Sequence, residues 1–140
     1  MRFMVIVKAS EESEKGVMPT AEELAQMGAF NEELVKAGVM LAGEGLYDSA
    51  KGVRVHFDEK GTTTVVDGPF AETKELIAGY WIWELPSLTD AVEWLKKAPF
   101  KNGSVEIRQV HGAEAFDEVM TPELREQEDR LRAQLSTQNQ

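Results

Sequence analysis

The chain has 140 residues, no cysteine and a formal net charge of -10 at pH 7. This length suits one domain with an ordinary core, and the absence of thiols excludes disulfides, thiolate metal sites and a cysteine nucleophile. The negative charge disfavours nucleic acid and anionic membranes as partners, since both carry phosphates. No run approaches the roughly 20 apolar residues of a membrane span, and the apolar N-terminal run is too short for a secretory leader. We therefore expect a cytoplasmic protein.

Hydrophobic periodicity predicts the first elements. Residues 3–7 are apolar at every position, which predicts a strand covered on both faces. A capping box at residues 20–23 begins a helix whose apolar residues recur at helical spacing until Gly38. Residues 39–47 then form a strand that two glycines interrupt.

The second half of the domain repeats this plan after a hairpin. Alternating residues and a Lys60-Gly61 turn predict a half-exposed hairpin over residues 53–66. Residues 80–85 form a strand rich in aromatics, Ser87 begins a second helix that ends before a proline, and residues 104–111 form the last strand.

The order strand, helix, strand, hairpin, strand, helix, strand predicts an α+β fold, a ferredoxin-like unit with an inserted β-hairpin over residues 1–112. The remainder, 113–140, is expected to be an extension with one extra C-terminal helix that begins at Thr121-Pro122. Its apolar stripe is thin, which favours docking on a neighbouring surface such as that of a partner subunit. Residues 136–140 are expected to be disordered.

The sheet face opposite the helices is also expected to be apolar. We place Met4, Ile6, Trp81 and Trp83 on that face. Burying each such side chain is worth about 1.5 to 3 kcal/mol, so a face of them does not stay in water. The pattern therefore predicts a homodimer that covers the face.

The most informative segment is Asp67-Gly68-Pro69-Phe70-Ala71-Glu72-Thr73-Lys74-Glu75, followed closely by Gly79-Tyr80-Trp81-Ile82-Trp83. It resembles the signature of the DGPF-domain proteins, a branch of the YCII-related family, and the resemblance extends over roughly residues 1–110. This resemblance implies a dimeric α/β barrel, with a cavity between sheet and helix or at the dimer interface. The wider family is associated with a His-Asp pair in a pocket, and no residue here matches that histidine.

Two carboxylates are candidate catalytic residues. Asp67 precedes Gly-Pro, where an aspartate either accepts backbone N–H bonds to brace the turn or serves a site. Glu44 stands between two glycines, where it is either a general base on the barrel wall or an edge residue that faces water.

Aromatic, sulfur-containing and charged side chains around the motif are candidate ligand-binding residues. They are Trp81, Trp83, Met40, Glu72, Lys74 and His111. We expect a cavity beside the motif with an indole wall and Glu44 or Asp67 at its polar end. Two histidines without ligand spacing predict no metal site, and neither a phosphate loop nor a GxSxG motif is present, so no cofactor is expected.

Two functions remain open. The first is a small-molecule-binding or regulatory module, since the resemblance to proteins encoded with or fused to alternative sigma factors implies an accessory role in transcription without DNA contact. The alternative is a cofactor-free enzyme in which Asp67 and Glu44 move protons on a small organic acid, lactone or phenol. Binding is slightly favoured, because no complete acid–base constellation can be assembled.

Overall fold

The computed structural model describes residues 1–139, and the chain divides into two compact units, Met1–Val110 and His111–Gln140. The sequence placed this boundary after residue 112. The elements of the first unit are, in chain order, β1 (Arg2–Lys8), α1 (Glu11–Glu14), α2 (Ala21–Lys36), β2 (Met40–Gly45), η1 (Ser49–Lys51), β3 (Val53–Phe57), β4 (Thr63–Asp67), η2 (Thr73–Glu75), β5 (Ile77–Glu84), α3 (Leu88–Leu95) and β6 (Val105–Gln109).

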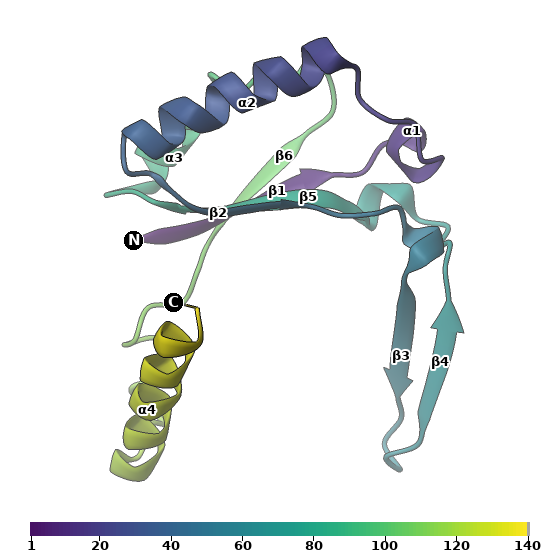
Figure 1. The fold of residues 1–140 in the computed structure, drawn as a ribbon. Coiled ribbons are helices and arrows are strands. Elements are labelled where there is room, and N and C mark those ends of the chain that lie inside the picture. The colour runs from purple at the N-terminus through teal and green to yellow at the C-terminus, as the bar shows by residue number, and fades with distance from the viewer. Residues whose placement is uncertain (140) are drawn as a thin grey trace. The chain divides into compact units, whose positions relative to one another are not determined.

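The first unit has a four-stranded antiparallel sheet with the strand order β2-β5-β1-β6. Strands β3 and β4 form a separate hairpin, inserted in the chain between β2 and β5. Helices α2 and α3 both lie on one face of the four-stranded sheet (Figure 1). The predicted α+β, ferredoxin-like class with an inserted hairpin is therefore confirmed.

Local signals set the bounds of the long helix α2. The Thr20 hydroxyl accepts from the Glu23 backbone N–H at 3.1 Å, and the Glu23 carboxylate accepts from the Thr20 backbone N–H at 3.2 Å. This reciprocal pair satisfies two donors that a helix start leaves unpaired. The helix ends at Lys36, and Gly38 then takes a φ of 72°, a left-handed conformation that costs glycine little.

The core lies between the sheet and α2. Val5 and Phe3 of β1 lie opposite Trp81 and Trp83 of β5, so these four side chains share one face. Phe30 of α2 meets both indoles edge to face, with ring centroids 5.8 Å and 6.3 Å away. Trp83, at 0% exposure, is the largest of the fully buried side chains among the described residues.

The predicted placement of Trp81 and Trp83 on the open face was wrong. The β1–β5 register puts both indoles on the helix-covered face, whereas Met4 and Ile6 point to the other face. The error has a physical reason: both parities of β1 and β5 are apolar, so alternation could not show which parity faces the helices.

The face that the helices leave open is nonetheless apolar at its centre. Met4 lies opposite Ile82, and Ile6 lies opposite Tyr80. We call these four residues the open sheet face. Ile6 is buried and the other three are half-buried, while both helices lie on the opposite face of the sheet (Figure 1). The apolar second face that the sequence predicted therefore exists, with Ile82 and Tyr80 in place of the indoles.

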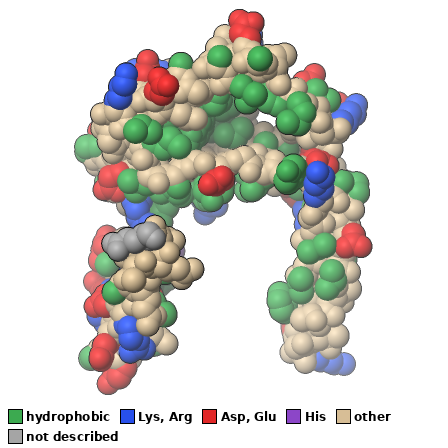
Figure 2. Space-filling view, in the orientation of Figure 1, with side chains coloured by type: hydrophobic (Ala, Val, Ile, Leu, Met, Phe, Trp, Pro, Cys, Tyr) green, Lys and Arg blue, Asp and Glu red, His purple; other side chains and the backbone are tan. Residues whose placement is uncertain are grey.

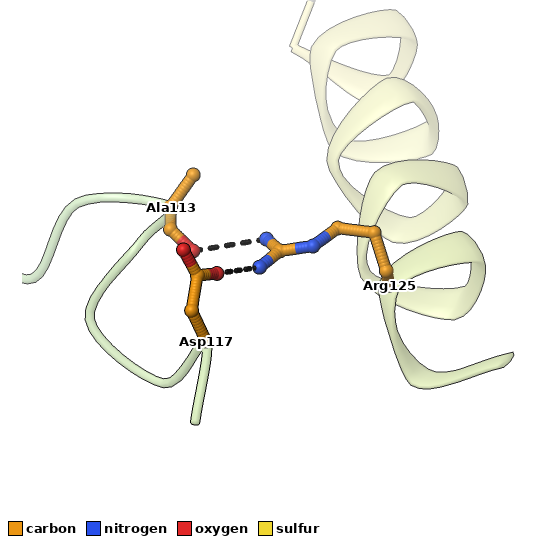
Figure 3. Close-up of polar contacts among 3 residues, drawn as sticks. All are labelled: Ala113, Asp117 and Arg125. Atoms are coloured by element: carbon orange, nitrogen blue, oxygen red, sulfur yellow. Dashed lines mark hydrogen bonds and ion pairs between the residues drawn. The ribbon is translucent and has the colours of Figure 1, made fainter. Parts of the chain in front are cut away.

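The second unit contains α4 (Pro122–Gln138), which Thr121 caps with Pro122 in the first turn. Arg125 of α4 donates one hydrogen bond to the carbonyl of Ala113 at 2.9 Å and another to the carboxylate of Asp117 (Figure 3). This clamp holds residues 113–117 against the start of the helix. Disorder was predicted for residues 136–140, but 136–138 form the last turn of α4, and residue 140 lies outside the described residues.

Candidate functional site

The four residues Asp67–Phe70, which we call the DGPF turn, lie against the 3-10 turn η1. The Gly68 N–H donates to the Gly52 carbonyl at 2.9 Å, and the Phe70 N–H donates to the Ser49 hydroxyl at 3.0 Å. A Cβ at Gly68 would lie 1.8 Å from the Ser49 carbonyl oxygen, so only glycine fits. The peptide bond between Gly68 and Pro69 is cis.

The short helix α1 reaches the same place through Glu14. Its carboxylate accepts from the Ser49 backbone N–H at 3.0 Å and from the Ser49 hydroxyl. Ser49 therefore links α1 to the DGPF turn, because its hydroxyl oxygen also accepts from Phe70. Sequence reasoning missed this pair; the available signal was the capping box between Ser10 and Ser13 that begins α1.

A cleft of about 520 Å³ opens beside the turn. Two cations lie over aromatic rings in its lining: Lys51 Nζ is 4.1 Å from the ring centroid of Tyr47, and Arg54 Cζ is 3.8 Å from that of Phe70. Such stacking restricts where each cation lies and is worth about 0.5 to 1 kcal/mol at exposed sites. Among the described residues, neither cation forms an ion pair.

The predicted catalytic carboxylates lie on different sheets. Asp67 ends β4 in the hairpin, whereas Glu44 lies on β2 opposite Tyr80, next to the open sheet face. Both side chains are exposed. Of the two roles left open for Asp67, bracing has no hydrogen bond to support it among the described residues, where Ser49 and Gly52 accept from the backbone of the turn.

The predicted ligand-binding residues are dispersed. Trp81 and Trp83 lie in the core, and Met40 packs there too, since a Cβ at Gly43 would meet both its Cε and Trp81 Cδ1 at 2.8 Å. Glu72, Lys74 and His111 are exposed, and the His111 ring meets Phe116 edge to face in the second unit. None of the six lines the cleft, whose aromatic wall is Tyr47 and Phe70. Their assignment to ligand binding stays a prediction.

Ser49→Ala is expected to lower the free energy of unfolding by about 1 to 2 kcal/mol, because the Glu14 carboxylate and the Phe70 N–H both lose a partner. Asp67→Asn, the matched control on the same turn, is expected to change it by less than about 0.5 kcal/mol, as for an exposed surface position. Urea unfolding of both variants checks this. Equal losses of unfolding free energy in the two variants would indicate that the Asp67 carboxylate also braces the turn.

No group of three or more His, Cys, Asp or Glu side chains among residues 1–139 is arranged to hold a metal ion. Within the same range, every helix is too short or too polar to span a bilayer.

Comparison with known proteins identifies the family of this chain. The family model of the YCII-related domain matches residues 1–114. An uncharacterized protein of Rhizobium meliloti (strain 1021) is 43% identical over 51 residues, which cover 34% of this chain and 41% of that relative's length. The solved structure of 5-chloro-2-hydroxyhydroquinone dehydrochlorinase from Burkholderia phenoliruptrix AC1100, in complex with 2,5-dihydroxybenzoquinone, is 19% identical with a TM-score of 0.39, and the match covers 80% of this chain and 96% of that one. Because the family model matches most of its length, the chain belongs to the YCII-related family.

Proposed function

We propose that this protein is a small-molecule-binding module whose ligand lies in the cleft beside the DGPF turn. The observation that carries the proposal is the pair of cation–aromatic contacts on the cleft lining, Lys51 over Tyr47 and Arg54 over Phe70. The cleft volume of about 520 Å³ falls within the roughly 300 to 1,000 Å³ of small-ligand sites. A few oriented polar groups beside apolar walls are what such a ligand requires.

The charges of the lining narrow the ligand class. Lys51 and Arg54 form no ion pair with any residue of 1–139 and so offer free donors, while Glu14 accepts hydrogen bonds from Ser49. Asp48 and Glu75 also line the cleft, so an acidic ligand is favoured only where its charge reaches the two cations. A small organic acid with a planar apolar body suits such a cleft, because its acidic group can reach the two cations and its apolar body suits the apolar walls.

Binding is preferred to catalysis because of where the carboxylates lie. General acid–base chemistry needs groups within hydrogen-bond reach of one substrate, whereas Asp67 and Glu44 lie on separate sheets. The alternative, a cofactor-free enzyme, would need a proton-transferring group at the cleft itself. The accessory role in transcription belongs to the same proposal, with ligand occupancy as the regulatory signal.

Saturation-transfer NMR with benzoate and benzyl alcohol tests the proposal. We expect saturation transfer to benzoate in the wild type, reduced about threefold or more in Arg54→Gln, because the variant loses both the charge and the stack on Phe70. Lys97→Gln is the matched control, since Lys97 lies 4.5 Å from the Trp94 ring centroid and is not part of the cleft lining. Equal signals in all three proteins would place the binding elsewhere, and no transfer to either probe would contradict the proposal.

We also propose that the protein is a homodimer formed through the open sheet face. Met4, Ile6, Tyr80 and Ile82 make a continuous apolar strip across β1 and β5. A contiguous apolar surface of this kind marks an interaction site in soluble proteins, and two-fold pairing of identical faces is the commonest way to cover one.

A further inference from the structure

The β3–β4 hairpin leaves an apolar surface uncovered within the unit Met1–Val110. The sequence predicted a half-exposed hairpin, but every position of both strands is exposed, with Phe57 at 77% and Val65 at 63%. A two-stranded hairpin is at best marginally stable in water unless it packs against something. The hairpin therefore needs a surface to cover it.

The register shows which face needs the cover. Val55 lies opposite Val65, and cross-strand partners point to the same side. Alternation along both strands places Val53, Phe57, Thr63 and Asp67 on the same side. We call the four apolar residues of this side, Val53, Val55, Phe57 and Val65, the apolar hairpin face. The other face carries Arg54, His56, Thr64 and Val66. Figure 2 shows hydrophobic side chains at the surface along the hairpin.

The direction of the hairpin indicates which molecule covers its apolar face. It extends away from the layer of α2 and α3, toward the side of the open sheet face (Figure 1). Two sheets stacked face to face lie about 10 Å apart, whereas a five-residue strand spans about 17 Å. Once a second copy covers the open sheet face, the hairpin is longer than the gap between the sheets and must run beside that copy.

We propose that the β3–β4 hairpin is a dimerisation arm whose apolar face packs on the second copy of this chain. The inference rests on the proposed homodimer and adds a second contact to it. A different partner on the hairpin would leave the open sheet face wet, whereas a second copy covers both surfaces in one two-fold interface. Both arms are then equivalent, and each gains the packing surface that an isolated hairpin lacks.

The test is Phe57→Glu against His56→Glu, two neighbouring positions that receive the same charge on opposite faces of the hairpin. Sedimentation velocity over a range of concentrations is expected to show a wild-type dimer. Phe57→Glu should raise the dimer dissociation constant about tenfold or more, whereas His56→Glu should change it about twofold or less. Far-UV circular dichroism verifies that each variant is folded. Equal dissociation constants for the two variants would overturn the proposal that the hairpin is a dimerisation arm.

Ile82→Glu tests the proposed homodimer separately from the proposed arm, because Ile82 lies on the open sheet face and not on the hairpin. If Ile82→Glu dissociates the dimer and Phe57→Glu does not, the dimer stands and the arm is overturned. A monomeric wild type at micromolar concentration would overturn both. Benzoate binding in the same proteins reports separately on the cleft.

Cross-linking supplies a readout that does not depend on stability. The chain has no cysteine, so Phe57→Cys can carry a single benzophenone label in an otherwise unlabelled protein. Irradiation of mixed ¹⁴N and ¹⁵N protein is expected to give mixed-isotope cross-linked peptides between copies. Cross-links confined to one chain would overturn the proposal.

Discussion

Gly68→Ala is expected to lower the free energy of unfolding by about 3 kcal/mol, the upper end of the usual cost of overpacking. The added Cβ would lie 1.8 Å from the Ser49 carbonyl oxygen and 2.7 Å from its carbonyl carbon. Both are backbone atoms, which cannot turn aside as a flexible side chain can. Relief therefore requires the DGPF turn to leave η1, and urea unfolding at fixed protein concentration measures the cost.

Gly45→Ala is the matched control, because a Cβ at this strand glycine would meet nothing within 4 Å. Alanine there is expected to be neutral or stabilising by up to about 1 kcal/mol, since glycine loses more backbone entropy on folding. A Gly68→Ala protein that unfolds at the wild-type urea concentration would show that the turn does not depend on contact with η1.

Trp83→Ala is expected to cost about 3 to 5 kcal/mol, the range for removal of a large aromatic side chain from a core. Trp83 is 0% exposed, and its ring centroid lies 5.5 Å from that of Trp81 and 6.3 Å from that of Phe30. The cavity left behind would lie between the sheet and α2. Thermal unfolding by circular dichroism at fixed protein concentration measures the loss.

Phenylalanine substitutions separate packing from hydrogen bonding at the two indoles. The Trp81 N–H donates to the Asn31 side-chain oxygen at 3.0 Å, whereas the buried Trp83 N–H has no hydrogen-bond partner among the described residues. Trp83→Phe removes an unpaired donor, while Trp81→Phe leaves the Asn31 oxygen without its donor. We therefore expect Trp83→Phe to cost about 1 kcal/mol less than Trp81→Phe. The reverse order would indicate that volume dominates at both positions.

Much of the fold was predictable because its signals are local. The capping box at Thr20, the left-handed Gly38 and the Lys60-Gly61 turn each act within a few residues, so the bounds of α2 and the hairpin follow from neighbouring side chains. The DGPF motif was likewise recognisable as a turn at the end of a strand, since glycine and proline restrict the backbone wherever they occur.

The candidate site depended on contacts between distant segments. Ser49 is 35 residues from Glu14 and 21 residues from Phe70, so no local pattern indicated that these residues meet. The sequence consequently offered Asp67, the adjacent polar residue, as one possible brace for the turn, whereas in the tertiary structure the Ser49 hydroxyl accepts from the Phe70 N–H. Tyr47, Lys51 and Arg54 were missed because only the packing of the DGPF turn on η1 brings Phe70 beside them.

The sequence by itself determined the order of the main strands and helices, the starts of the three long helices and the presence of a second apolar sheet face, because propensity, capping and hydrophobicity belong to individual segments. Only the tertiary structure decided which residues occupy that face. In strands apolar on both sides, the antiparallel pairing of Val5 with Trp81 sends the indoles toward the helices and leaves Ile82 on the open side. A shift of one residue in this pairing would exchange the two faces. Strand register therefore determines which residues lie on each face, and register depends on pairing between segments that are distant in the sequence.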